Sequence, residues 1–182
     1  LNGHTLTIKG DLIQAGGTMY CNNGTLNVEG DYRIQEATTD NDGNTVYDYS
    51  DGNLRMVNEA DRVNVSGDFI MQSCFSNVTT YFSNDFTAGT LTIKGNFSQL
   101  YGNGCGGQNF VASGTHKVVL DGNGARTVTF ENSNSHFNEL VVGTDTRLYW
   151  QGDFVINPLL HDLTIYNSVT MSSANTINLN GH

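Results

Sequence analysis

Carboxylate side chains follow glycine at several points of the chain and are the first candidates for chemistry. The pair Gly-Asp or Gly-Asn recurs along the chain, and its second residue is Asp11, Asp31, Asp68, Asn96 or Asp153. On adjacent strands, about 4.8 Å apart, Asp31 and Asp68 could share a cation or act as an acid and base pair. Asp and Asn also hydrogen-bond the backbone at chain turns. Because Asn96 keeps that structural role and loses the acid and base role, the pattern favours a structural column.

A second acidic group lies in an insertion between two copies of the repeated pair. Asp40, Asp42 and Gly43 lie in the segment from Thr38 to Tyr49, and carboxylates around a glycine turn are typical of calcium loops. An EF-hand requires Asp at the start of its loop and Glu at the end, where this chain has Thr38 and Tyr49. We expect a solvated insertion loop. A weak calcium site at Asp40 and Asp42 is the alternative, and calcium is the only cofactor that the pattern leaves open.

Tyrosines outside the repeated motif are the candidates for binding sugars. Exposed tyrosines among Asn and Asp side chains suit sugar rings, because they combine stacking with hydrogen bonding. The candidates are Tyr47, Tyr49, Tyr81 and Tyr101. Trp150 instead aligns with apolar residues of the motif and is expected to pack in the core. The five histidines lie beside no recognisable nucleophile motif.

The segment from Cys105 to Gln108 is the most unusual local sequence. Its Cys-Gly-Gly-Gln order is similar to the Cys-Gly-Glu-Gln of complement-type internal thioesters, in which the cysteine sulfur is joined to the glutamine side chain. That chemistry belongs to helical domains, whereas no helical periodicity appears here, so a chance match in a glycine-rich loop is favoured. Cys21, Cys74 and Cys105 fit no zinc spacing. One disulfide with a spare thiol and three buried thiols both remain open.

A short apolar motif recurs along the chain and would position these candidates. Apolar residues stand four and two places before its glycine and two places after it, and such alternation is typical of a strand buried on one face. The intervals between copies vary while the motif does not, which favours stacked coils over a sandwich. We therefore predict an all-β, single-stranded parallel β-helix (β-solenoid), right-handed, with loop insertions between rungs. The copies are Leu6–Ile13, Leu26–Ile34, Val63–Met71, Leu91–Gln99 and Leu148–Ile156, with a weaker copy at Val118–Asn123.

The composition excludes several classes of partner. The 18 acidic residues outnumber the 8 basic ones, which gives a net charge of -10 at pH 7. Without a basic stripe, binding to nucleic acid is not expected, and an anionic membrane surface would repel the chain. Nor is there an apolar run long enough for insertion into a bilayer.

A tetrad near the start of the chain recurs near its end. Leu1-Asn2-Gly3-His4 is repeated as Leu179-Asn180-Gly181-His182. The repetition predicts that residues 1–182 form one β-solenoid domain that is a single period of a tandem array. Since the ends of a solenoid need a neighbour or a cap, neighbouring repeats joined end to end are the expected partners.

Several stretches also resemble a known family. FVASGTHKVVLDGNGARTVTF (110–130) and SHFNELVV (135–142), with GDYRIQ and GDFIMQS, are similar to repeat units of very large surface proteins of Firmicutes. The resemblance covers most of the chain, implies an extracellular location on the bacterial surface, and carries no functional residue. We expect a structural or adhesive repeat that forms an elongated display stalk, not an enzyme, with host or cell-wall glycans as candidate ligands. A carbohydrate-binding module is one alternative, and a polysaccharide lyase or hydrolase of the β-helix type, acting through Asp31 or Asp68, is another.

Overall fold

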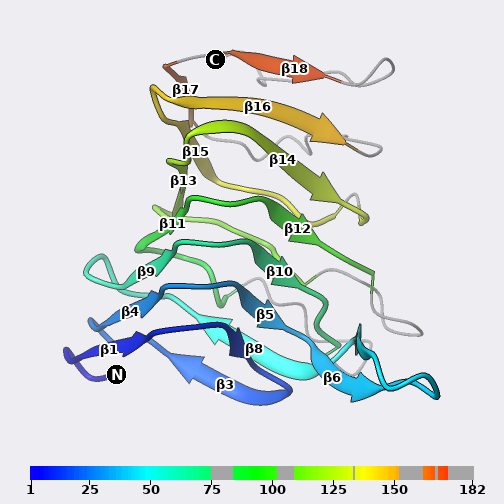
Figure 1. Ribbon diagram of the computed structural model, residues 1–182. Helices are drawn as coiled ribbons and strands as arrows, with labels where there is room; N and C mark the ends of the chain where they lie inside the picture. Colours follow the sequence, from blue (N-terminus) through cyan, green and yellow to red (C-terminus); the bar gives the residue numbers. More distant parts are fainter. Residues whose placement is uncertain (75–83, 102–108, 133, 152–161, 167, 172–182) are drawn as a thin grey trace.

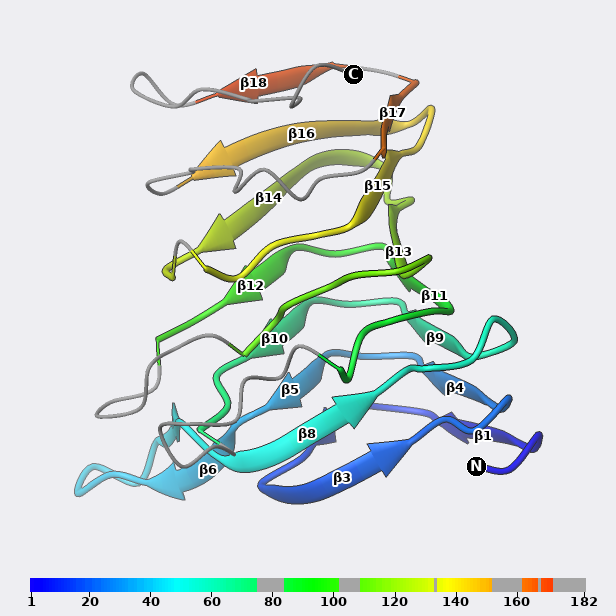
Figure 2. The same ribbon diagram turned by 180° about the vertical axis from the view of Figure 1, so that it is seen from behind.

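The chain is all-β and most of its strands pair in parallel (Figures 1 and 2). The computed structural model describes residues 1–74, 84–101, 109–132, 134–151, 162–166 and 168–171. Every regular element in these ranges is a strand. The strands stack along one direction, from blue at the N-terminal end to orange at the other end in Figure 1.

Two seven-stranded parallel sheets make up the body of the protein. Each strand of the first sheet is followed in the chain by a strand of the second, and we call such a pair a rung. Successive rungs are also neighbours in space, because each sheet takes its strands in chain order. The first sheet contains β1 (Thr5–Ile8), β4 (Thr25–Val28), β9 (Arg62–Val65), β11 (Thr90–Ile93), β13 (Lys117–Leu120), β15 (Glu139–Val142) and β17 (Asp162–Ile165). The second contains β2 (Leu12–Ile13), β5 (Tyr32–Ile34), β10 (Phe69–Met71), β12 (Phe97–Gln99), β14 (Gly124–Phe130), β16 (Thr146–Gln151) and β18 (Val169–Met171).

Shorter pairings complete the described structure. β3 (Gly16–Tyr20) and β8 (Asp51–Arg55) pair in parallel, and isolated parallel bridges join Met56 to Phe86 and Phe86 to Ala112. The acidic insertion forms an antiparallel hairpin of β6 (Glu36–Thr39) and β7 (Thr45–Asp48). In Figure 1 this hairpin projects sideways from the stack. Insertions thus leave the rungs without interrupting the two main sheets.

The strand registers confirm the apolar columns predicted from the sequence. Ile8 pairs with Val28, Val28 with Val65, and Val65 with Ile93. Val28, Val65 and Ile93 are each at most 2% exposed. The residues two places after the glycine pair in the same way in the second sheet: Leu12, Tyr32, Phe69 and Phe97. Equivalent side chains therefore lie above one another in a continuous core.

Aromatic rings fill the middle of this core. Phe97, which is 0% exposed, contacts four other phenylalanines with ring centroids 4.7–5.7 Å apart. Such ring pairs stabilise a fold beyond the area they bury. The four partners are Phe69, Phe110, Phe130 and Phe137. The core thus joins rings from several rungs into one cluster.

One predicted alignment is wrong. The sequence places Leu148 in the column of Leu6 and Trp150 in the column of Ile8, but β16 belongs to the second sheet, where Trp150 pairs with Val128. Both sheets alternate with period two, so a Leu-x-Trp-x-Gly pattern fits either of them. Gly152 and Asp153 lie outside the described residues.

The strand that takes this place in the first sheet is β15, which the motif alignment missed. Its Leu140 and Val142 are buried and pair with Val118 and Leu120. Gly143 follows Val142 directly, whereas in the other copies the glycine stands two places after the equivalent residue and is followed by Asp or Asn. The motif therefore identified strands of the first sheet only where the glycine, followed by Asp or Asn, stands at the end of the strand.

Candidate functional site

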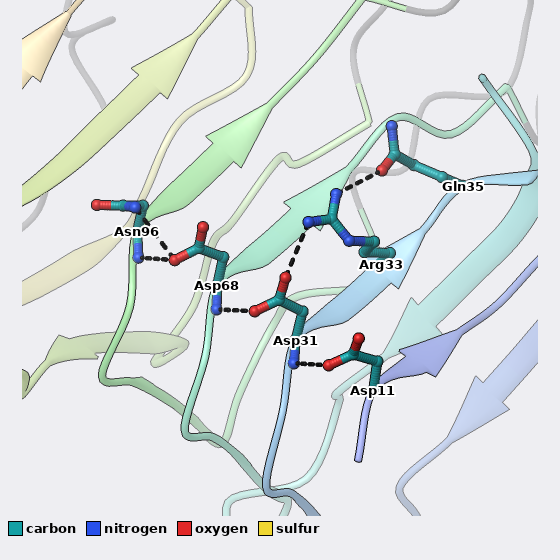
Figure 3. A network of polar contacts seen from close by, with 6 residues as sticks. All are labelled: Asp11, Asp31, Arg33, Gln35, Asp68 and Asn96. Atoms are coloured by element: carbon teal, nitrogen blue, oxygen red, sulfur yellow. Dashed lines mark hydrogen bonds and ion pairs between the residues drawn. The ribbon is translucent and has the colours of Figure 1, made fainter. Parts of the chain in front are cut away.

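The side chains after the corner glycines form a hydrogen-bonded ladder, shown in Figure 3. The Oδ1 atom of Asp11 accepts the backbone N–H of Asp31 at 2.8 Å, and Oδ1 of Asp31 accepts that of Asp68 at 2.8 Å. Oδ1 of Asp68 accepts the backbone N–H of Asn96 at 2.7 Å and its side-chain amide at 3.1 Å. Asn96 continues the ladder by accepting the N–H of Thr127 at 2.9 Å. Each corner side chain therefore holds the backbone of the following rung.

The glycines of the same corner stack too closely to carry a side chain. The N–H of Gly67 donates to the carbonyl of Gly30, and that of Gly95 to the carbonyl of Gly67, both at 2.9 Å. A Cβ atom on Gly95 would lie 2.3 Å from the Gly67 oxygen, and one on Gly30 would lie 2.1 Å from Oδ1 of Asp11. Neither glycine has a positive φ. Close stacking, and not an unusual backbone conformation, requires glycine here.

We expect Gly95→Ala to lower the free energy of unfolding by about 2–3 kcal/mol, because the atom that its methyl group meets belongs to the backbone and cannot rotate away. Gly10→Ala is the matched control, since nothing lies within 4 Å of a Cβ atom at Gly10; its effect should stay below about 0.5 kcal/mol. Urea denaturation followed by circular dichroism measures both. Equal losses at the two positions would contradict this explanation of the corner.

Arg33 connects the ladder to the hairpin. Its guanidinium donates to Oδ2 of Asp31 at 2.8 Å and lies 4.6 Å from the ring centroid of Tyr47 on β7. It also contacts the side-chain oxygen of Gln35 at 3.5 Å, and the amide of Gln35 donates to Gln72 at 2.7 Å. The ion pair and the cation–π contact thus fasten the insertion to the stack.

These contacts occupy both oxygens of Asp31 and one oxygen of Asp68, the two candidate metal ligands in the ladder. Both carboxylate oxygens of Asp31 accept hydrogen bonds from protein donors, and one oxygen of Asp68 accepts two. Across the described ranges, no group of three or more His, Cys, Asp or Glu side chains could hold a metal ion. The geometry supports backbone anchoring as the role of this column.

Asp40, the first candidate of the calcium loop, shapes the tip of the hairpin. Its Oδ1 accepts the backbone N–H groups of Asp42 and Asn44 at 2.9 and 2.8 Å, and its Oδ2 accepts the Asn44 amide at 3.2 Å. The hydrogen bonds from Asn44 and its neighbours lower the pKa of Asp40. Gly43, with φ +83°, supplies the left-handed residue of the turn. The side chain of Asp40 is therefore accounted for by turn formation, to which Asp42 contributes its backbone N–H.

Three of the four tyrosines predicted as sugar-binding candidates are exposed, and Tyr81 lies outside the described residues. Tyr47, Tyr49 and Tyr101 are 38%, 37% and 49% exposed. One face of the Tyr47 ring is covered by Arg33. The backbone of Tyr101 is fixed by Glu131, which accepts its N–H at 2.6 Å. Among the described residues, no ring contact joins these tyrosines into one platform.

The described cysteines differ in redox state. Cys74 is disulfide-bonded, whereas Cys21 is a free, buried thiol. Burial, and secondarily the carboxylate of Asp61, raises the pKa of Cys21 to about 12, so its thiol stays protonated and unreactive at neutral pH. The thioester candidates Cys105 and Gln108 lie outside the described residues.

Asp61 is a structural carboxylate that the sequence pattern did not reveal. It is 0% exposed; its Oδ1 accepts the N–H of Asn23 at 2.6 Å, and its Oδ2 accepts those of Val57 and Asn58 at 2.8 and 3.0 Å. Asp61 lies six residues before Gly67, just outside the aligned motif. The other copies have His4, Gly24, Gly89 and His116 at that position, so extending the alignment would not have singled out Asp61.

His116 holds the equivalent position before β13 and was also missed. It is 0% exposed, and neither ring nitrogen has a hydrogen-bond partner. Its ring lies edge-on to Phe86 and Phe110, with centroids 5.3 and 5.8 Å away. Burial lowers the pKa of His116 to about 3. His116 is therefore a neutral member of the core at physiological pH.

No family model, curated protein or solved structure matches this chain. Among the described residues, no helix has the length and apolar character needed to cross a membrane. The function is consequently inferred from the geometry of the corner ladder, the core and the insertions.

Proposed function

We propose that this chain is a structural repeat of a bacterial cell-surface protein, folded as a parallel β-helix. Its rungs would give length, and its insertions would be displayed to the surroundings as an adhesive or spacing surface. The acidic composition, with a net charge of -10, suits an exposed stalk that repels anionic membranes. The resemblance to repeats of large Firmicutes surface proteins supports the location.

The observation that carries the proposal is that the corner carboxylates bind the protein's own backbone. In a β-helix enzyme these side chains would be available to substrate. Here Asp11, Asp31 and Asp68 each accept the backbone N–H of the next rung. A side chain that holds the backbone in this way stabilises the stack, and a structural role accounts for its recurring place at the corners of these described rungs.

The order of the strands supports the β-helix. Both main sheets take their strands in the same chain order. The parallel bridges Met56–Phe86 and Phe86–Ala112 continue in the same direction on a third side. A parallel coil of this kind is right-handed in nearly every known case. Each rung would then bury its backbone hydrogen bonds against its neighbours, which gives a stiff rod.

The ladder gives a direct test with a matched pair of variants. Asp68→Asn keeps the accepting oxygen, as Asn96 does naturally, and should change the free energy of unfolding by less than about 0.5 kcal/mol. Asp68→Ala leaves two donors of Asn96 without their acceptor and should cost about 1–3 kcal/mol. Chemical denaturation compares the two variants with the parent chain.

The same proteins are then incubated with a panel of acidic and neutral polysaccharides, and reducing ends or unsaturated products are measured. A structural repeat predicts no turnover by any of them. Cleavage by the parent chain that disappears in Asp68→Asn, while stability is unchanged, would overturn the proposal in favour of a lyase or hydrolase.

A further inference from the structure

Cys74 takes part in a disulfide at the end of the rung that contains β10. It lies three residues beyond Met71, the last residue of β10, and its backbone N–H donates to the carbonyl of Ser50 at 2.8 Å. The sulfur of Cys74 is disulfide-bonded, and the two Cα atoms of a disulfide are about 4–7 Å apart. A second cysteine therefore belongs next to this point of the stack.

The composition leaves one candidate for that second cysteine. The chain has three cysteines, and Cys21 is a free thiol that is 0% exposed. Cys21 also precedes β4 of the first sheet, whereas Cys74 follows β10 of the second. Only Cys105 remains as the partner of Cys74.

The described residues on both sides of Cys105 lie beside the end of β10. On one side, the carbonyl of Tyr101 accepts the side-chain amide of Gln72 at 3.1 Å. On the other side, the side-chain amide of Asn109, which is 0% exposed, donates to the carbonyl of Ser73 at 3.3 Å. Gln72 and Ser73 directly precede the bonded cysteine, so the chain passes close to it both before and after Cys105.

We infer that Cys74 and Cys105 are joined by a disulfide that fastens one rung to the next. The strands that precede them, β10 and β12, pair in parallel, and the closed covalent ring contains β11 and β12, a complete rung. In the reaction both S–H bonds break and one S–S bond forms, while a disulfide oxidant such as oxidised glutathione takes the two electrons and two protons and leaves as two thiols. The bond also takes the sulfur that a thioester between Cys105 and Gln108 would need.

The disulfide also bears on where the protein works. Disulfides persist in oxidising compartments and are rare in the cytosol, so this link favours a location outside the cytosol, for a reason independent of the family resemblance. The pairing itself does not depend on the proposed function, because it follows from the three cysteines and from the contacts at the end of β10. Failure of the stalk proposal would leave it standing.

Peptide mapping of the 182-residue chain tests the pairing. The chain is equilibrated in a glutathione buffer that is mostly oxidised, its free thiols are alkylated in denaturant, and it is digested with trypsin without a reductant. We expect the peptides of Cys74 and Cys105 to be linked, Cys21 to be alkylated, and the chain to be lighter than its reduced form by two hydrogen atoms. Each cysteine falls in a different peptide: residues 10–33 contain Cys21, residues 63–94 contain Cys74 and residues 95–117 contain Cys105.

Three alkylated cysteines, a link that includes Cys21, or a covalent dimer would overturn the inference. A loss of one ammonia, with alkylation at Cys21 and Cys74 only, would also overturn it, because it would show that the sulfur of Cys105 is joined to Gln108.

The melting temperature tests the fastening role. Reduction of the parent chain should lower it by about 5–15 °C, because the bond restricts the unfolded chain. The double variant Cys74→Ser, Cys105→Ser should melt at the temperature of the reduced parent, and the reductant should not change it. Cys21 is retained in both proteins, so its buried thiol does not contribute to the difference. Equal melting temperatures of the oxidised and reduced parent would contradict a link that fastens the rungs.

Discussion

Phe97→Ala is expected to lower the free energy of unfolding by about 3–5 kcal/mol, more than any substitution at the corner ladder. The ring is 0% exposed, and its removal leaves a cavity among the aromatic side chains of several rungs. Rings from different rungs contact Phe97. The side chains that line the cavity therefore belong to several rungs and cannot all move to fill it. Urea denaturation measured by fluorescence and by circular dichroism gives the change.

Two variants make this result specific. Phe97→Leu retains much of the buried volume and should cost roughly half as much. Thr92→Ala lies on the outer face of the adjacent β11 strand, at a position of intermediate exposure, and should have an effect below about 0.5 kcal/mol. A loss below about 1 kcal/mol for Phe97→Ala would contradict a close-packed core at this position.

The second large effect is a dependence of stability on pH that originates at His116. The unfolded chain takes up a proton on this residue near pH 6.5, whereas burial lowers its pKa in the folded protein to about 3. Between these values the unfolded state binds more protons, so the contribution of His116 to stability falls as the pH falls, by about 1.4 kcal/mol per pH unit at most. Above pH 6.5 this contribution is constant.

His116→Leu removes the titrating group while keeping an apolar side chain, and neither ring nitrogen has a partner to lose. Its free energy of unfolding should therefore fall less steeply than that of the parent chain between pH 6.5 and 3. His4→Leu is the control, since His4 holds the equivalent position in the first rung but is exposed. Parallel acid profiles of the His116→Leu variant and the parent chain would show that His116 titrates normally.

The sequence predicts the core of this fold well because the core repeats. Val28, Val65 and Ile93 belong to a period-two pattern that survives loops of different length, and the structure pairs them as predicted. The corner was also recognisable, since Gly-Asp or Gly-Asn recurs at one point of each copy. The residues of the corner column could thus be identified from the sequence, and the sequence also favoured a structural role for them over acid and base chemistry.

What the sequence could not provide is the direction and partner of each polar contact. The prediction had Asp31 bonding to the backbone at its own corner, whereas its Oδ1 accepts the N–H of Asp68 in the next rung. This contact joins residues far apart in the chain, and no local pattern encodes it. Period-two alternation likewise could not assign Trp150 to the first or the second sheet. His116 carried no local signal, because a buried histidine and a catalytic one look alike in a sequence.

The hairpin of β6 and β7 has a consequence for how such a protein can change over generations. Its turn is closed by Asp40, its strands pair with each other, and the Arg33–Tyr47 contact attaches it to the body. Mutations at the tip would consequently leave the folding of the stack almost untouched. Sequence changes in this outward segment could therefore accumulate faster than changes in the scaffold beneath it.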